Sequence, residues 1–275
     1  MQPLPIKNTV SSTLTGRKGK LLWRLLPKIA KTNTGRSIFY LVTRFTIERY
    51  STVKVSQTDF KLSDPNPRLA WRNRTFAKKE PDTLRWIESF ARGAILWDIG
   101  ANIGLYSIYA AKVRNCKVLA FEPSVFCLEF LARNIWLNQL HEQVTIVPNP
   151  LCDTSKANTL TLNSRDWGES SNSFGTTFDQ DGKEIEASFE YKILGTTIDE
   201  SISKLNLPAP QHIKIDVDGI EPLILAGGTQ TLMQVESVSV EVPTYRGANE
   251  RVSELLGQAG LKLVLDSDNQ IWRRV

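Results

Sequence analysis

The sequence predicts an α/β fold, in which a mostly parallel sheet is covered by helices on both faces. From residue 94 onward, short apolar runs typical of buried strands alternate with longer stretches whose apolar residues recur every three or four positions. Repeated strand–helix–strand units of this kind favour parallel neighbours and leave both faces of the sheet for helices. The 275 residues are 41% hydrophobic and 23% charged, so the chain has enough apolar side chains for one large core.

The first segment, residues 1–50, is predicted to be a basic extension. Residues 1–47 contain nine Lys and Arg and no Asp or Glu, which leaves 25 basic and 29 acidic residues in the rest of the chain. Apolar residues from Leu21 to Ile29 recur at helical spacing and predict an amphipathic helix within residues 17–31. This helix either packs on the core with a solvated basic face or anchors the chain peripherally on an anionic membrane.

No apolar run approaches the roughly 20 residues that cross a bilayer. We therefore expect a cytoplasmic protein, with at most peripheral contact at the inner membrane face. Because the excess positive charge is confined to the N-terminal extension, the predicted catalytic part does not indicate nucleic acid binding.

Residues 51–93 are expected to lead into the main domain. Apolar and polar residues alternate loosely from Val53 to Leu62, which predicts a short hairpin within residues 51–76. Helical spacing then predicts a helix over residues 82–90.

The main domain is predicted over residues 94–275. Strands are expected, in chain order, at residues 94–98, 117–121, 143–147, 213–217 and 237–242, with helices at 103–113, 124–138 and 221–226. A terminal hairpin pairs residues 261–265 with 270–273. Residues 153–190 interrupt the alternation of strands and helices and are rich in Asn, Ser, Asp and Gly. This segment is predicted to be an insertion of short antiparallel strands or a lid.

The cysteines and histidines exclude several classes of site. Cys116, Cys127 and Cys152 show no C-x-x-C spacing, which argues against a zinc knuckle or a disulfide framework and favours a reducing compartment. The only histidines, His141 and His212, lie far from any G-x-S-x-G turn, so a Ser-His-Asp hydrolase is not supported.

The strongest motif is the strand-to-helix loop that contains Asp98, Gly100, Asn102 and Gly104. Glycine in such a turn allows a ligand to approach the backbone closely. The glycine spacing differs from that of the G-x-G-x-x-G loop, which holds a pyrophosphate. In this sequence an acidic residue, Asp98, precedes the first glycine. A ligand with a cationic ammonium and sulfonium suits this loop better than a phosphate does, which indicates S-adenosylmethionine rather than NAD.

Two further groups of charged residues follow predicted strands. Glu122 comes about 20 residues after the glycine loop, where such folds hold ribose hydroxyls; capping of the next helix is the alternative role. Period-2 alternation places Lys214, Asp216 and Asp218 on one face of the strand predicted at 213–217. Burying a charged group costs free energy unless the group is paired or serves a functional site. Lys214 and Asp216 therefore form either a structural ion pair or part of a functional site.

Four segments resemble, in this order, those of the FkbM-type methyltransferases: Trp97–Gly104 (WDIGANIG), Phe121–Pro123 (FEP), residues 196–199 (TTID) and residues 213–221 (IKIDVDGIE). The resemblance covers roughly residues 94–242. It implies a Rossmann-like methyltransferase fold with a mostly parallel seven-stranded sheet, S-adenosylmethionine as methyl donor, and O-methylation of a hydroxyl on a sugar, glycan, glycolipid or secondary metabolite. Asp218 stands where the family commonly has Glu.

The resemblance also implies roles for individual residues. It places Asp98, Gly100, Asn102 and Gly104 at the methionine side of the donor pocket, Glu122 at the ribose and Asp153 near the adenine. The family gives no secure catalytic base, so we predict candidates from their positions at strand ends: Asp216 first, then Lys214, Glu221 and Glu241. No metal is predicted; a divalent ion held by Asp216, Asp218 and Glu241 is the alternative.

Two other functions compete with methyl transfer. An NAD-dependent oxidoreductase is disfavoured because the glycine spacing is wrong, and a non-catalytic, membrane-associated binding protein would use the basic N-terminal helix. The expected partner is a small-molecule, glycan or lipid-linked hydroxyl acceptor, with possible membrane contact through residues 17–31. The sequence does not identify the acceptor.

Overall fold

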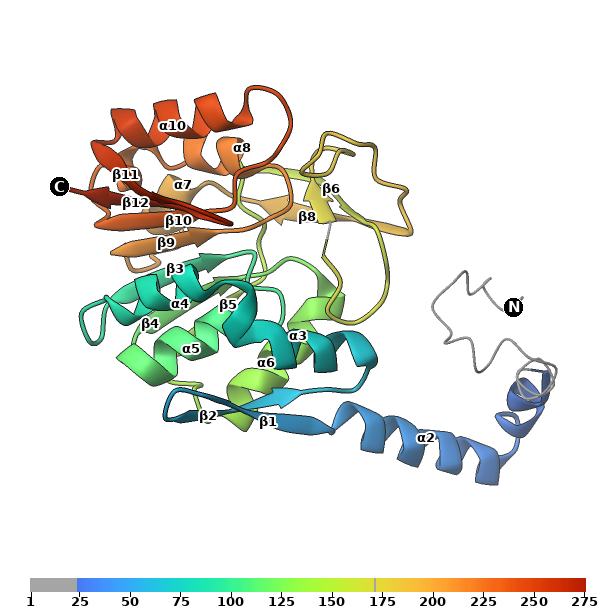
Figure 1. Cartoon of the computed structure of the whole chain (residues 1–275). Helices are drawn as coiled ribbons and strands as arrows, with labels where there is room; N and C mark the ends of the chain where they lie inside the picture. Colours follow the sequence, from blue (N-terminus) through green and yellow to red (C-terminus); the bar gives the residue numbers. More distant parts are fainter. Residues whose placement is uncertain (1–23, 171) are drawn as a thin grey trace. The chain divides into compact units, whose positions relative to one another are not determined.

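The computed structural model describes residues 24–170 and 172–275 (Figure 1). The chain divides into two units, with the boundary between Arg49 and Tyr50. The first contains a helical segment at residues 24–29 and the helix α2 (Asn33–Ile47). Residues 17–23 of the amphipathic helix predicted from the sequence lie outside the described residues. None of the helices in the described ranges is long and apolar enough to cross a membrane.

A seven-stranded sheet forms the centre of the second unit. Its strands are β3 (Ile95–Ile99), β4 (Lys117–Phe121), β5 (Val144–Val147), β9 (His212–Ile215), β10 (Ser237–Val240), β11 (Leu261–Asp266) and β12 (Gln270–Arg274). They lie in the order β11-β12-β10-β9-β3-β4-β5. The five strands from β10 to β5 are parallel, and β12 is antiparallel to both of its neighbours.

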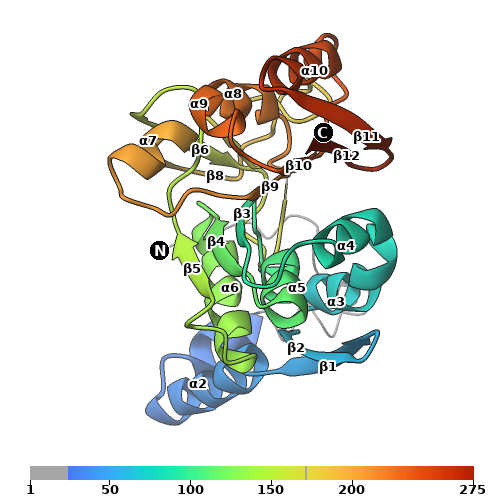
Figure 2. The same ribbon diagram turned by 90° about the vertical axis from the view of Figure 1, so that its left-hand side faces the viewer.

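Helices cover both faces of this sheet (Figures 1 and 2). One face carries α3 (Pro67–Lys79), α4 (Pro81–Glu88), α5 (Leu105–Arg114) and α6 (Val125–Leu137), and the other carries α7 (Ile198–Ser203), α8 (Glu221–Ala226), α9 (Thr229–Leu232) and α10 (Ala248–Gln258). Side chains alternate along each strand, so that Leu96 joins the core under α5 while Trp97 joins the core under α8 and α10. The predicted α/β, Rossmann-like fold is confirmed.

Two smaller sheets flank the central one. The strands β1 (Tyr50–Val55) and β2 (Thr58–Ser63) form the predicted hairpin. Between β5 and β9, the strands β6 (Lys156–Leu162), β7 (Asn172–Phe174) and β8 (Phe189–Gly195) form an antiparallel sheet in the order β7-β6-β8. The segment that interrupts the strand–helix rhythm therefore extends beyond residue 190.

The helix α3 corrects the interpretation of residues 51–76 as a hairpin alone. The side chain of Asn66 accepts a hydrogen bond from the Leu69 backbone N–H, and Pro67 occupies the first helical turn. Asn as an N-cap followed by Pro is a helix-start signal, because Pro lacks only an N–H that would have no partner there.

The loop after β9 corrects a second expectation. The strand ends at Ile215, so Asp216 and Asp218 do not alternate along it. Asp218 has a φ of 62°, a left-handed conformation that a strand cannot contain. Asp216 and Asp218 instead lie on a turn that leads to α8.

Candidate active site

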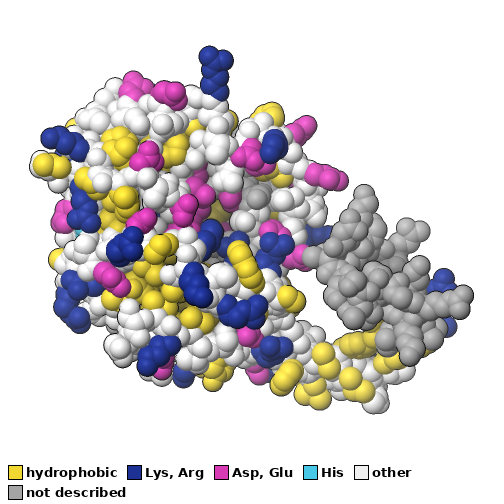
Figure 3. All heavy atoms as spheres, in the orientation of Figure 1, with side chains coloured by type: hydrophobic (Ala, Val, Ile, Leu, Met, Phe, Trp, Pro, Cys, Tyr) yellow, Lys and Arg dark blue, Asp and Glu magenta, His cyan; other side chains and the backbone are white. Residues whose placement is uncertain are grey.

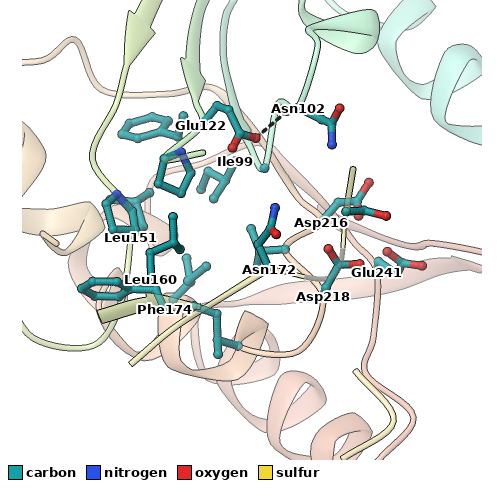
Figure 4. A pocket seen from close by; sticks show the side chains of 18 of the residues that line it. Ile99, Asn102, Glu122, Leu151, Leu160, Asn172, Phe174, Asp216, Asp218 and Glu241 are labelled. Atoms are coloured by element: carbon teal, nitrogen blue, oxygen red, sulfur yellow. Dashed lines mark hydrogen bonds between the residues drawn. The ribbon is translucent and has the colours of Figure 1, made fainter. Parts of the chain in front are cut away.

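A cavity of about 270 Å³ lies where the parallel strands end (Figure 4). Gly100, Glu122, Asp216 and Glu241, each just beyond a parallel strand of the sheet, line it. The connections from β3 and β9, which are neighbours in the sheet, leave toward opposite edges. Open α/β sheets bind ligands at such a switch point, at the carboxyl ends of the strands.

The two ends of the cavity differ in chemistry. At one end, Leu151, Leu160 and Phe174 form an apolar wall, and at the other end lie Asp216, Asp218 and Glu241 (Figure 4). Leu160 and Phe174 belong to the antiparallel strands β6 and β7. Sequence reasoning missed this wall, because nothing in a short polar segment shows that two of its apolar side chains face a site in another part of the fold.

Glu122 lies between these two ends, with its carboxylate buried at the end of β4. One carboxylate oxygen accepts a hydrogen bond from the Asn102 backbone N–H at 2.8 Å, and the other accepts one from the Ser124 N–H at 2.7 Å. Burial raises the pKa of Glu122 to about 7. The oxygens retain free lone pairs, so the carboxylate can also accept hydrogen bonds from a ligand in the cavity.

Two glycines of the glycine loop stand where the packing of the fold leaves no room for a side chain. Gly100 has a φ of +83°, and a Cβ added there would lie 1.8 Å from the carbonyl oxygen of Asp216. A Cβ at Gly104 would lie 2.5 Å from Leu131 on α6. Gly100 therefore lets the β3 loop and the β9 turn meet, and Gly104 lets two helices pack; Gly100 lines the cavity and Gly104 is not among its lining residues.

Asp98 is buried below the loop and is not among the lining residues of the cavity. Its carboxylate accepts a hydrogen bond from the Ser107 hydroxyl of α5 at 2.5 Å, and its Oδ1 has no partner in the described structure. Burial raises its pKa, with Lys214 acting in the opposite direction. Strand alternation explains this position, because Asp98 shares the α5 face of β3 with Leu96.

Lys214, Asp216 and Glu241 form a row of ionisable groups at the ends of β9 and β10. The Lys214 ammonium donates to Asp216 Oδ2 at 2.6 Å and lies 4.7 Å from the centre of the Tyr106 ring. Glu241 forms a hydrogen bond with Asp216 on the other side. Lys214 is 1% exposed, whereas the Asp216 side chain is 25% exposed and reaches the cavity.

A hydrogen bond joins the carboxyl groups of Asp216 and Glu241, and their pKa values are shifted in opposite directions. Burial raises the pKa of Glu241 to about 9, and the nearby Asp216 carboxylate adds to this effect. Burial also acts to raise the pKa of Asp216, but Lys214 and the hydrogen bond from Glu241 outweigh it and hold this pKa below its ordinary value. Glu241 therefore keeps the proton and Asp216 carries the charge.

Two other predicted residues lie outside the cavity. Glu221 is buried, and its carboxylate accepts hydrogen bonds from the backbone N–H groups of Val217 and Gly219 at 3.0 and 3.1 Å. It therefore holds the turn that carries Asp216. Asp153 is exposed, and its Oδ1 lies 3.9 Å from Lys156 Nζ. Leu151, two residues earlier in the segment after β5, lines the cavity, whereas Asp153 does not. Within the described ranges, no group of three or more Asp, Glu, His or Cys side chains is arranged to hold a metal ion.

A second cavity of about 290 Å³ adjoins the first. The two share six lining residues, namely Arg72, Lys79, Gly100, Asn102, Ser170 and Asp216. The remaining wall comes mainly from α3 and the start of α5. Because the sequence analysis did not predict α3, it missed Arg72 and this whole side of the site.

Comparison with known proteins identifies the family. The methyltransferase FkbM domain matches residues 98–260. The chain is 29% identical to hexuronic acid methyltransferase AglP of Haloferax volcanii, over 74% of this chain and 80% of that protein. It is 28% identical to methyltransferase sdnD of Sordaria araneosa, over 62% of this chain and 74% of that protein.

Among solved structures, methyltransferase FkbM from Methylobacillus flagellatus aligns with a TM-score of 0.46 and 14% identity. The alignment covers 67% of this chain and 44% of that one. The family match spans the glycine loop, Glu122, the Lys214–Asp216 pair and Glu241, and so includes most of the residues around the cavity. The chain belongs to the FkbM methyltransferase family and is an S-adenosylmethionine-dependent methyltransferase.

Proposed function

We propose that this methyltransferase transfers a methyl group to a hydroxyl of a sugar, glycan or secondary metabolite, with Asp216 and Glu241 receiving the hydroxyl proton. The observation that carries the proposal is the division of the cavity into an apolar end, a central carboxylate and an end with the Asp216–Glu241 pair. The name of its relative AglP, a hexuronic acid methyltransferase, supports a sugar as acceptor.

The lining residues fit the methyl donor. The apolar wall of Leu151, Leu160 and Phe174 suits a flat adenine ring, and Glu122 is placed to accept hydrogen bonds from the two ribose hydroxyls. Two buried side-chain oxygens in the lining, Asn102 Oδ1 and Asn172 Oδ1, have no partner in the described structure. Buried polar atoms without partners carry a free-energy cost, which donor groups on a ligand relieve.

The chain's own residues then have distinct tasks in methyl transfer. Bound S-adenosylmethionine would supply an electrophilic methyl group on a sulfonium, with the neutral thioether of S-adenosylhomocysteine as the leaving group. Asp216 accepts the hydrogen bond of the acceptor hydroxyl and orients its oxygen, and the Asp216–Glu241 pair takes the proton. Lys214 keeps Asp216 ionised, and Glu221 fixes the turn on which Asp216 stands. Asp98 does not line the cavity, and it influences the site only through the glycine loop above it and through its electrostatic interaction with Lys214.

Turnover is expected to rise with pH through about 9, the value to which the pKa of Glu241 is raised. Below that pH, Glu241 is protonated and its hydrogen bond weakens Asp216 as a base; above it, both carboxylates are ionised and the pair accepts a proton more readily. The measurement is the pH dependence of kcat with saturating donor. Glu241→Gln should remove the rise, and a rise that persists in this variant would contradict the role of the pair.

The function itself is tested by methyl transfer from labelled S-adenosylmethionine to a panel of glycosides and polyols. We expect the label in an O-methyl ether, identified by mass spectrometry after hydrolysis. NAD serves as the control ligand in binding measurements and should not bind. A label found only on nitrogen or carbon of an acceptor, or in a carboxyl methyl ester, would contradict the proposed hydroxyl chemistry.

A peripheral membrane contact through the N-terminal unit is a second proposal, because α2 exposes large apolar side chains. Ile38, Leu41 and Phe45 are 52%, 63% and 71% exposed. Thr32 caps the N-terminus of this helix, since its hydroxyl accepts a hydrogen bond from the Gly35 N–H at 3.0 Å, and the helix contains no acidic residue. A helix that combines apolar side chains with surrounding basic residues is suited to an anionic lipid surface, where each basic residue contributes about 1 kcal/mol.

The full-length protein is therefore expected to co-sediment with vesicles that contain phosphatidylserine at low salt and to be released at high salt. A double variant, Leu41→Ser with Phe45→Ser, should remain unbound, while Ser37→Ala on the same helix should behave like the wild type. Equal sedimentation of the double variant, or binding to neutral vesicles at all salt concentrations, would rule out this contact.

A further inference from the structure

The second cavity opens beside Asp216, on the side of the glycine loop that faces α3. Both cavities share Asp216, so a molecule in each could meet at that carboxylate. In an in-line displacement, the acceptor oxygen approaches the methyl group from the side opposite the sulfur. With the donor in the first cavity, the second cavity is the space from which an acceptor can reach Asp216.

The α3 wall of the second cavity is basic and aromatic. It contains Arg68, Arg72 and Lys79, with Trp71, whose side chain is 53% exposed. Figure 3 shows Lys and Arg side chains gathered over α3, next to a hollow that acidic side chains border. An exposed indole beside cations offers a flat apolar face to a sugar ring and a charge to its substituents.

The positive charges on this wall are not equally available. Arg68 forms an ion pair with Glu169 at 2.8 Å, and Lys79 forms one with Glu80 at 3.2 Å. Arg72 is only partly exposed and lines both cavities, and its guanidinium makes no hydrogen bond or ion pair with any residue that the structure describes. A half-buried guanidinium without a counter-ion provides five N–H donors in the planar arrangement that matches a carboxylate or a phosphate.

We propose that the acceptor is an anionic sugar, whose carboxylate or phosphate binds Arg72 while one of its hydroxyls meets Asp216. This inference rests on the proposed function and specifies its substrate class. The acidic end of the first cavity opposes any anion close to the reacting hydroxyl, so a cation on the α3 side is needed to hold such an acceptor. Arg72 provides that cation beside the shared edge of the two cavities.

Binding to the protein saturated with S-adenosylhomocysteine tests this inference by calorimetry. The probes are phenyl β-D-glucuronide, glucose 1-phosphate and neutral phenyl β-D-glucoside. The variant is Arg72→Gln, and the matched control is Arg74→Gln, an exposed arginine on the same helix that lines neither cavity. Gln is a good helix former, so both variants should fold like the wild type.

At least one anionic probe is expected to bind the wild type about tenfold or more tightly than the neutral glucoside, the size of effect that one charged hydrogen-bonded contact gives. Arg72→Gln should abolish that difference and leave S-adenosylhomocysteine affinity unchanged, whereas Arg74→Gln should retain it. The anionic probe that binds more tightly identifies the charged group of the acceptor, as a carboxylate if it is the glucuronide and as a phosphate if it is glucose 1-phosphate.

The inference is overturned if neutral and anionic probes bind equally, or if no probe binds. It is also overturned if Arg72→Gln loses affinity for S-adenosylhomocysteine, because the guanidinium would then bind the carboxylate of the donor. Failure of the proposed function is distinguishable from these. If the wild type does not bind S-adenosylhomocysteine at all, the donor site in the first cavity is wrong, and the anionic acceptor falls with it.

Discussion

Asp216→Asn is expected to bind S-adenosylmethionine as tightly as the wild type and to lose about 10²–10⁴-fold in turnover, the usual effect of removing a general base. An amide has the same shape as the carboxylate, so it can still accept the hydrogen bond of the acceptor hydroxyl. It cannot take the proton, and it cannot carry the charge that Lys214 pairs with at 2.6 Å. The loss should therefore appear in kcat rather than in donor affinity.

The measurement is steady-state methyl transfer together with calorimetric donor binding. Asp268→Asn, an exposed carboxylate in the terminal hairpin, is the matched control and should leave both values unchanged. Because Lys214 is buried and loses its counter-ion in the variant, thermal unfolding must show that Asp216→Asn is folded at the assay temperature. Wild-type turnover in a folded Asp216→Asn protein would remove Asp216 from the mechanism.

Glu122→Ala should weaken S-adenosylmethionine binding by about 1.5–3 kcal/mol, which is roughly tenfold to hundredfold in affinity. The substitution removes the carboxylate that lies between the two ends of the cavity and leaves the N–H groups of Asn102 and Ser124 without their acceptor. Glu122→Gln, which retains an acceptor oxygen but no charge, should lie between the wild type and Glu122→Ala.

Glu129→Ala is the control for this series, because Glu129 is an exposed residue of α6 that pairs with Arg133 and lines neither cavity. Calorimetry with S-adenosylmethionine gives the affinities, and circular dichroism shows whether each variant is folded. Unchanged affinity in a folded Glu122→Ala protein would mean that the ribose is held elsewhere.

Most of the sheet could be predicted from the sequence, because its buried strands are short apolar runs between glycine and polar turns. The strand at residues 117–121 and the helix at 221–226 have the predicted bounds. The helix α3 could not be predicted from periodicity alone, since its interior carries five charged side chains among few apolar ones, and only the Asn66–Pro67 start signal marked it. Its absence removed Arg72 from the predicted site.

The candidate site was predicted in position but not in every contact. Asp98 and Glu122 are both acids at strand ends, yet only Glu122 lines the cavity. The difference arises because Asp98 is still within β3 and points toward α5, whereas Glu122 follows the last residue of β4. Whether such a residue lies within the strand or just beyond its end therefore decides whether its side chain reaches the cavity, and sequence patterns fix strand ends only to within a few residues.

The central claim is that the donor lies in the first cavity with its sulfur directed at Asp216, and a crystal structure with S-adenosylhomocysteine tests it most directly. We predict adenine against Leu151 and Phe174, both ribose hydroxyls within hydrogen-bond distance of the Glu122 carboxylate, and the sulfur facing Asp216 and the second cavity. A nucleoside bound without contact to Glu122, or a sulfur turned away from Asp216, would contradict the account.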